Sequence, residues 1–429
     1  MKDFVVLNIG PFKELIKDNI WIPDSYDQHT LQPYYVHFML LPLQDMGYNV
    51  SVKDFEDIDK SKNWFINLNI GCWDPSMDLW SNIPSILLNE LIFGNAYLIM
   101  NSENEYNTTG LFNTFNIMYS KNPQVPIHKL IFLSAALNCK ENYNIWAESH
   151  NIPKKERLTV LYSCHIDLNF STRDNFLTLS NSPHSFPKTK KYTLLNRELR
   201  LHRPYLVSLL AEKDILNKGY VSLGAGTNHI NASINAGGWA NFLKSTLSNS
   251  DDPKHQLIIE DIRSGIDKIH DKIPICLDKQ EFNTNYASYD DTPIDYIKDS
   301  YFSLVTSTHF FKWQEESPGW NEKEWKPVMC RHPFIIVNRP HTLKCMRQIG
   351  ILTFNNWFDE SYDDIEDDWL RLKAIVDEVE RLSNLSDEEW FKIYDEVSHI
   401  LEYNRWVILE KLKGSLFYNT DLKEFLKFI

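Results

Sequence analysis

The sequence predicts an α/β protein with two domains, each built on a parallel sheet that helices cover. Short apolar runs alternate with segments of helical periodicity along most of the chain, which is the pattern of a doubly wound parallel sheet. The length of 429 residues is enough for two ordinary domains, each with its own core. A hydrophobic content of 43% and an aromatic content of 13% are typical of a globular protein and not of a disordered one.

The first domain is predicted to span residues 1–185. Short apolar runs predict its strands, and longer segments with helical spacing of the apolar residues predict its helices. The expected strands are 4–9, 49–52, 64–70, 96–100, 129–133 and 158–163, and the expected helices are 34–46, 85–93 and 143–150.

The second domain is predicted to span residues 186–429. The boundary falls in the segment 169–191, which is rich in Ser, Thr, Pro and Lys and has the character of a linker or mobile loop. Its expected strands are 192–195, 220–223, 272–277, 301–305, 333–337 and 351–354, and its expected helices are 204–210, 342–349, 369–382 and 388–401. Ser386 and Glu389 form a capping box for the last of these helices. The Asn-, Ser- and Gly-rich segment 228–250 is expected to be an irregular surface excursion.

Two motifs of the second domain have residue types that suit a nucleotide diphosphate. Arg197, Arg200 and Arg203 lie between a strand end and a helix start, where guanidinium groups match phosphate oxygens. Glu322 and Lys323 lead into a short helical segment, where a lysine suits a diphosphate and a carboxylate suits the hydroxyls of a ribose. Ser307 follows a buried apolar strand, at the strand end where such sheets bind ligands. The alternatives are a solvated basic turn and a solvated ion pair.

The stretch 301–364 also resembles a known family. Its motifs are Glu322-Lys323 with Trp325, Lys326 and Pro327, then His332-Pro333-Phe334, Gly350-Ile351-Leu352-Thr353-Phe354 and Asp359-Glu360-Ser361-Tyr362-Asp363. Together they are similar to the donor-binding half of GT-B glycosyltransferases, in particular the fucosyltransferase-like and phage-encoded groups. The match covers part of the chain only. Asn321 departs from the pattern, which usually has Thr or Ser before the Glu-Lys pair.

The resemblance implies an architecture and a donor site. It implies two Rossmann-like domains facing a central cleft, with C-terminal helices packing back across both. It further implies a UDP- or GDP-linked sugar in the second domain, with Glu322 on the ribose and Lys323 with Arg200 or Arg203 on the diphosphate. No cofactor and no metal at the reaction centre are expected, because positive charge stabilises the leaving nucleotide.

A glycosyl transfer also needs a general base near the acceptor hydroxyl. The candidates follow predicted strands of the first domain: Asp74, Glu103, His165 and Asp167. His165 and Asp167 leave one strand on the same face because their spacing is two. The resemblance favours inversion at the anomeric carbon, and an acceptor that is either a glycan or a hydroxymethylated DNA base of a phage.

The net charge and the cysteine spacing argue against several classes of protein. A net charge of −14 makes non-specific binding to nucleic acids or anionic membranes unfavourable, although a local basic groove remains compatible with it. The six cysteines have no zinc-ligand spacing, and no apolar run suits a signal peptide or a membrane span. We therefore expect a cytoplasmic enzyme, in the host cytoplasm if a phage encodes it. The alternatives are a non-catalytic nucleotide- or glycan-binding protein, and a metal-dependent hydrolase that uses Asp290 and Asp291.

Overall fold

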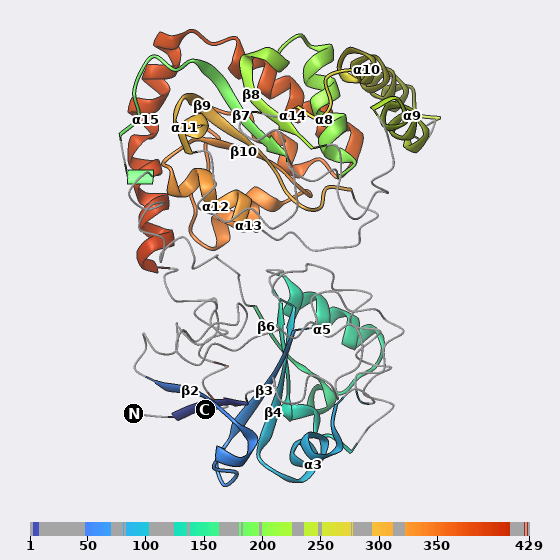
Figure 1. Cartoon of the computed structure of the whole chain (residues 1–429), viewed down its shortest axis with the longest axis vertical. Helices are drawn as coiled ribbons and strands as arrows, with labels where there is room; N and C mark the ends of the chain where they lie inside the picture. The colour runs from blue at the N-terminus through green and yellow to red at the C-terminus, as the bar shows by residue number, and fades with distance from the viewer. Residues whose placement is uncertain are drawn as a thin grey trace. The chain divides into compact units, whose positions relative to one another are not determined.

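The chain forms two compact units in the computed structural model (Figure 1). The first unit comprises Met1–Leu168, Glu315–Asn321 and Lys411–Ile429, and the second comprises Asn169–Gln314 and Glu322–Glu410. The structure describes residues 3–7, 48–69, 80, 83–102, 124–134, 138–162, 180–181, 183–196, 200–224, 236–247, 251–275, 277, 294–311, 322–411, 424 and 427. The boundary between residues 185 and 186 stays a prediction.

The first unit is built on a six-stranded sheet in the order β2-β1-β3-β4-β5-β6, and its strand pairs are parallel. The strands are β1 (Asp3–Leu7), β2 (Asn49–Lys53), β3 (Trp64–Asn69), β4 (Ala96–Ser102), β5 (Leu130–Ser134) and β6 (Thr159–Tyr162). The helices α3 (Ser85–Phe93) and α5 (Cys139–Ser149) pack on β4 and β6 respectively. All six predicted strands are thus present. A buried strand such as β5 (LIFLS) appears in the sequence as a continuous apolar run, whereas the edge strand β2 (NVSVK) is only partly buried and alternates with polar residues.

The second unit is built on a four-stranded parallel sheet in the order β10-β9-β7-β8. Its strands are β7 (Lys190–Asn196), β8 (Gly219–Leu223), β9 (Ser300–Thr306) and β10 (Phe334–Val337). The chain moves outward from β7 to β8 and then crosses back to β9 and β10, so the strand order reverses between β7 and β9. Such a reversal is where open α/β sheets bind their ligands, at the carboxyl ends of the strands.

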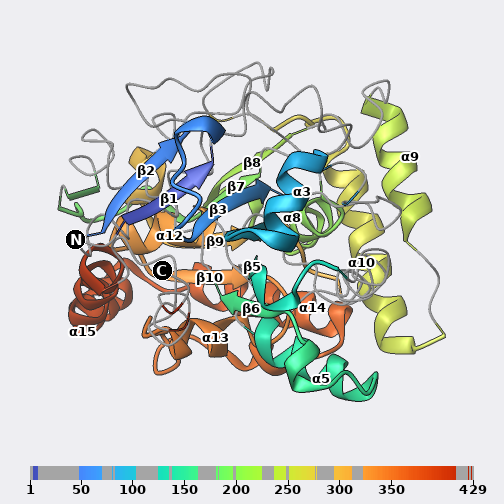
Figure 2. The ribbon, with the colours of Figure 1, turned by 90° about the horizontal axis from the view of Figure 1, so that it is seen from below.

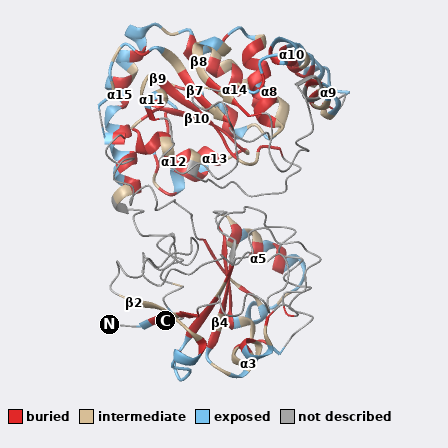
Figure 3. Ribbon diagram, viewed as in Figure 1, coloured by how far each residue is buried: buried red, intermediate tan, exposed pale blue. Residues whose placement is uncertain are grey.

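Helices surround this second sheet. They are α8 (His202–Glu212), α9 (Ala236–Thr246), α10 (Pro253–Ile269), α11 (Ile294–Lys298), α12 (Glu322–Met329), α13 (Thr342–Gln348), α14 (Asp368–Ser383) and α15 (Asp387–Trp406). Helices α9 and α10 lie side by side in two perpendicular views (Figures 1 and 2). In Figure 3 the strands of both sheets are largely buried, and the exposed residues lie mainly on the outer faces of helices and on turns.

The predicted fold class is confirmed: two α/β units on parallel sheets, with helices at the C-terminal end of the second. The predicted capping box is also present, because Ser386 Oγ accepts the Glu389 N–H (3.2 Å) and the Glu389 carboxylate accepts the Ser386 N–H (2.7 Å). The arrangement of the two units around a cleft stays a prediction. Among the helices in the described part of the chain, none is long and apolar enough to cross a membrane.

Three predicted elements of the second unit were wrong. Residues 351–354 form no strand. The side chain of Asn404 accepts a hydrogen bond from the N–H of Leu352 and donates one to the carbonyl of Leu352, both at 2.8 Å. It therefore takes the backbone groups that a neighbouring strand would otherwise pair with. The expected strand 272–277 is reduced to a single antiparallel bridge between Leu223 and Ile275. Within 228–250, residues 236–246 form helix α9, whose buried Ala240 and Leu243 supply an apolar face that the polar composition concealed.

Candidate functional site

Three strands of the second sheet end together at one edge. Val337 at the end of β10 pairs with Thr306 at the end of β9. Thr193 pairs with Ser303, which brings Asn196 at the end of β7 level with Thr306. The Thr306 hydroxyl donates a hydrogen bond to Oδ1 of Asn196, so β7 and β9 are joined by side chains where the strand order reverses.

The residue after β9, Ser307, is held from three sides. Its N–H donates to the carbonyl of Val337 (3.1 Å), which extends the ladder to β10 by one bond. Its carbonyl accepts hydrogen bonds from His202 Nε2 and Arg203 Nη2, both at 3.1 Å and both at the start of α8. Its hydroxyl donates to the carboxylate of Glu324 in the first turn of α12. The backbone at this position is therefore fixed by α8, β10 and α12 together.

Four positive charges converge beyond this edge, and we call Arg200, Arg203, Lys323 and Arg339 the basic cluster. They come from the turn before α8, the first turn of α8, the first turn of α12 and the loop after β10. Their effect is visible at His309, whose pKa falls to about 4, first because the ring is buried and then because Arg200, Arg339, Arg203 and Lys323 oppose its protonation. Four charges from separate elements thus act on one point.

The basic cluster has the chemistry of an anion site. Guanidinium forks bind phosphate oxygens in pairs, and a lysine in the first turn of a helix adds its charge to the positive end of the helix dipole. The chain as a whole carries a net charge of −14, so this positive edge opposes the field of the rest of the protein. It is suited to an oligophosphate ligand.

The sequence-predicted donor residues fall into one place. The same edge of the second sheet is reached from three elements. Arg200 and Arg203 come after β7, Ser307 comes after β9, and Lys323 lies in the first turn of α12. Glu322 is the first residue of α12, and its side chain lies outside the described residues. Their role toward a ligand stays a prediction.

The candidate general bases Asp74, Glu103, His165 and Asp167 lie outside the described residues. The same is true of Asp290 and Asp291, the residues of the hydrolase alternative. The choice of general base and the hydrolase alternative therefore stay predictions.

Sequence reasoning missed four residues of this edge: Asn196, His309, Glu324 and Arg339. Asn196 is the last residue of β7, and His309 and Arg339 each follow a strand by two or three residues. This position at or just after a strand could have identified them in the sequence, because polar side chains beyond the ends of parallel strands gather at one edge of the sheet. Glu324 is completely buried (0% exposed), which the run Glu322-Lys323-Glu324 does not indicate by itself.

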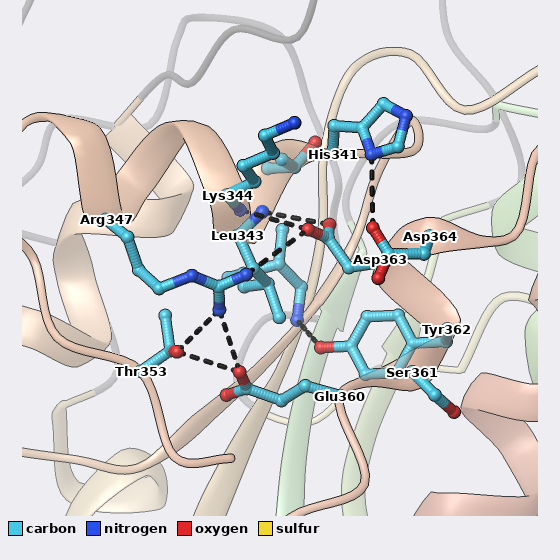
Figure 4. Close-up of polar contacts among 12 residues, drawn as sticks. His341, Leu343, Lys344, Arg347, Thr353, Glu360, Ser361, Tyr362, Asp363 and Asp364 are labelled. Atoms are coloured by element: carbon cyan, nitrogen blue, oxygen red, sulfur yellow. Dashed lines mark hydrogen bonds and ion pairs between the residues drawn. The ribbon is translucent and has the colours of Figure 1, made fainter.

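The acidic stretch after residue 358 has a structural explanation (Figure 4). Asp363 accepts the N–H groups of Leu343 and Lys344 at 2.9 and 3.0 Å, so its carboxylate occupies the N-terminus of α13. Glu360 accepts hydrogen bonds from Thr353 Oγ1 (2.7 Å) and from the N–H of Phe354 (2.6 Å). Within the ranges that the structure describes, no group of three or more His, Cys, Asp or Glu side chains is arranged to hold a metal ion.

Burial acts on both of these carboxylates. It raises the pKa of Glu360 and of Asp363 above their ordinary values, and the hydrogen bonds from Thr353 Oγ1 and the N–H groups oppose that shift. Because the Asp363 carboxylate occupies the N-terminus of α13, that helix end is already paired with an anion from the chain itself.

Comparisons with known proteins give limited results. No protein-family model and no curated protein matches the chain. Among solved structures, the chain is similar to the crystal structure of an α,α-trehalose-phosphate synthase (UDP-forming) from Burkholderia vietnamiensis. That alignment covers 100% of this chain and 99% of the other, with a TM-score of 0.42 and 9% sequence identity. A likeness of this degree carries no argument about the residues of the site, so the proposals below rest on the geometry described above.

Proposed function

We propose that the chain is a glycosyltransferase that moves a sugar from a nucleotide-diphosphate sugar to an acceptor hydroxyl. The observation that supports it is the basic cluster at the carboxyl edge of the second sheet, beside the point where the strand order reverses. This edge combines four positive charges with the position at which doubly wound sheets hold nucleotides. The motifs that resemble the donor-binding half of GT-B glycosyltransferases fall in the same unit.

In this proposal each residue of the edge has a role. Arg200 and Arg203 bind the diphosphate, and Lys323 adds a third charge from α12. Glu322 binds the hydroxyls of the ribose, and Ser307 lies beside the diphosphate. As the bond to the sugar breaks, negative charge grows on the leaving diphosphate, and preorganised positive charge stabilises it without a metal ion.

The acceptor half of the reaction is assigned to the first domain. A carboxylate or imidazole among Asp74, Glu103, His165 and Asp167 removes the proton from the acceptor hydroxyl. The reaction inverts the anomeric carbon, and the donor is UDP- or GDP-linked. The acceptor is a glycan or a hydroxymethylated base of phage DNA, and assays with both kinds of acceptor separate the two.

The donor site is tested by a thermal-shift panel of UDP, GDP, CMP and their common sugar conjugates. A ligand at 100 times its dissociation constant stabilises the folded protein by about 2.7 kcal/mol. We expect one nucleotide family to raise the melting temperature of the wild type and to lose most of this effect on Lys323→Ala. The matched control is Lys373→Ala on α14, which removes the same charge from an exposed pair with Asp377.

The outcomes separate the candidate functions. Stabilisation that is equal in wild type, Lys323→Ala and Lys373→Ala would place the nucleotide elsewhere. Binding without transfer to any acceptor would favour a non-catalytic binding protein. Turnover that a chelator abolishes, and that is lost in Asp290→Asn, would favour the metal-dependent hydrolase.

A further inference from the structure

Asn196, the last residue of β7, has all but one of its polar groups paired within the second unit. Its N–H donates to Oγ of Ser222 on β8 (3.1 Å), and its carbonyl accepts the N–H of Gly224 (2.9 Å). Its Oδ1 accepts the hydroxyl of Thr306 on β9. Among the described residues, no acceptor meets the remaining group, the amide nitrogen Nδ2, although the side chain is completely buried (0% exposed). The N–H bonds of this amide are therefore hidden from water without a partner.

The stability of the fold does not explain this unpaired donor. A buried hydrogen-bond donor that has lost its contact with water and gained no acceptor destabilises the folded state. An apolar pair at the ends of β7 and β9 avoids that cost. Most buried polar groups in folded proteins are paired, and such rules are broken mainly at functional sites, where a ligand supplies the missing partner.

The hydrogen bonds of β9 relate this amide to the basic cluster. Asn196 is bound to Thr306, and the carbonyl of the next residue, Ser307, accepts a hydrogen bond from Arg203 Nη2 (3.1 Å). The amide and the guanidinium are thus fastened to adjacent residues of one strand end, whose Cα atoms are about 3.8 Å apart. Between them along the chain lies the turn that carries Arg200 and leads into α8.

This edge is where a diphosphate fits best. Doubly wound sheets hold diphosphates between a strand end and the N-terminus of the following helix, beside the point where the strand order reverses. The oxygens of a diphosphate carry negative charge, so they accept stronger hydrogen bonds than the neutral oxygens of a base or a ribose.

We propose that Nδ2 of Asn196 donates a hydrogen bond to a non-bridging oxygen of the donor diphosphate. This inference rests on the proposed function, and it goes further by giving the diphosphate an uncharged contact of fixed direction. The basic cluster attracts the diphosphate from several elements, whereas an amide held by three hydrogen bonds offers its donor from one place. Because the side chain has no exposed surface in the free protein, a local rearrangement of the edge accompanies binding.

The experiment is isothermal titration calorimetry with UDP-glucose and GDP-mannose on the wild type and on the double variant Asn196→Leu, Thr306→Val. The double variant removes both partners of the side-chain pair together with the unpaired donor, so neither partner is left buried alone. We expect its affinity for the nucleotide sugar that the wild type binds to fall at least about tenfold, which is the usual effect of losing a hydrogen bond to a charged group.

Stability without ligand separates a ligand contact from a structural role. In urea unfolding, the free double variant should be more stable than Thr306→Val, because it no longer buries an unpaired amide. Weaker binding without a matching loss of stability is expected of a group that contacts the ligand. A residue with a structural role alone would lose both together, and that result would overturn the proposal.

Shorter ligands locate the contact within the donor. Inorganic pyrophosphate and the matching nucleoside diphosphate should lose affinity for the double variant by the same factor as the nucleotide sugar. Uridine or guanosine, which has no phosphate, should bind both proteins equally. An equal loss for the nucleoside would assign Nδ2 to the base or the ribose and overturn the contact with the diphosphate. Asn384→Leu, at the exposed end of α14, is the matched control and should bind like the wild type.

A second variant tests the same contact if the double variant does not fold. Asn196→Asp keeps the shape of the side chain and an acceptor for Thr306, but it puts an oxygen in place of the donor. At pH 8.0 it should bind the nucleoside diphosphate more than tenfold more weakly than the wild type, because a carboxylate repels the diphosphate. Asn384→Asp adds the same charge at the end of α14 and should bind like the wild type. The melting temperature without ligand checks that each variant is folded.

The two proposals fail in different ways. A nucleotide sugar that binds the wild type and the variants of Asn196 equally overturns the role of Asn196 and leaves the donor site intact. If neither nucleotide sugar binds the wild type, and the wider panel of the preceding section also finds none, both the donor site and the role of Asn196 are wrong.

Discussion

Thr306 and Asn196 join β9 to β7 through a hydrogen bond between their side chains, and the amide nitrogen of Asn196 is left without an acceptor among the described residues. Oδ1 of Asn196 accepts the hydroxyl of Thr306, while Nδ2, although Asn196 is completely buried (0% exposed), meets no hydrogen-bond acceptor among the described residues. A buried donor without a partner costs about 1–3 kcal/mol. In the proposed function this edge binds the donor, and an oxygen of the donor would accept a hydrogen bond from Nδ2.

This pair gives the first prediction. Thr306→Val alone should destabilise the protein by about 1–3 kcal/mol, because it leaves Oδ1 of Asn196 buried without its donor. The double variant Asn196→Leu, Thr306→Val removes both partners and the unpaired amide, so it should recover most of that loss and bind nucleotide sugars more weakly than the wild type. Denaturant unfolding and the thermal-shift panel measure the two effects. A double variant less stable than Thr306→Val would show that Nδ2 is satisfied in the free protein.

Ser307→Ala is the second prediction. Glu324 is buried and accepts the hydroxyl of Ser307, so removing that hydroxyl leaves a buried carboxylate with one hydrogen bond fewer. We expect a loss of about 1–3 kcal/mol in the free energy of unfolding. Ser398→Ala on the exposed face of α15 is the control, since its hydroxyl bonds only within its own helix, to the carbonyl of Asp395. Equal stability of the two variants would show that the bond between Ser307 and Glu324 contributes little.

The contact between α8 and α10 gives the third prediction. A Cβ added at Gly265 would lie 2.0 Å from the carbonyl oxygen of Ser208, so the two helix backbones approach too closely for a larger residue. Gly265→Ala should therefore destabilise the second unit by about 1–3 kcal/mol through overpacking, although alanine has the higher helix propensity. Glu260→Ala, on the exposed side of α10, should change stability far less. A more stable Gly265→Ala would mean that α10 can shift away from α8 at no cost.

The fourth prediction concerns pH. Burial raises the pKa of Glu360 above its ordinary value. At a pH between the pKa of the unfolded chain and that of the folded protein, Glu360 is therefore still protonated in the folded protein and already ionised in the unfolded chain. Glu360 therefore contributes stability that is lost as the pH rises from the unfolded-state pKa through the folded-state pKa. Relative to the wild type, Glu360→Gln should gain stability between pH 4 and pH 7, measured by urea unfolding at unit steps of pH. The opposite trend would show that the ion pair with Arg347 dominates over burial. The exposed Glu260→Gln is the control and should follow the wild type.

Much of the fold could be predicted from local sequence. Most strands of the two sheets contain a run of apolar residues, because central parallel strands are buried on both faces, although β2 (NVSVK), β7 (KKYTLLN) and β9 (SYFSLVT) also include polar residues. The start of α15 was equally predictable, since a capping box is formed by residues three apart. Arg197, Arg200, Arg203 and Lys323 could be nominated from residue type and from their place beside predicted helix starts, and the family resemblance favoured Arg200, Arg203 and Lys323 among them.

The rest depended on contacts between distant segments. Residues 351–354 are as apolar as a strand, yet Asn404 supplies their backbone partners from 52 positions further along the chain. Arg339 and His309 became candidates only when the strand order brought the ends of β7, β9 and β10 to one edge. The sequence by itself determined most of the strands and the start of α15, because hydrophobic burial and capping act over a few residues. The tertiary structure alone decided which charges share a site, because electrostatic interaction depends on distance in space and not on separation along the chain.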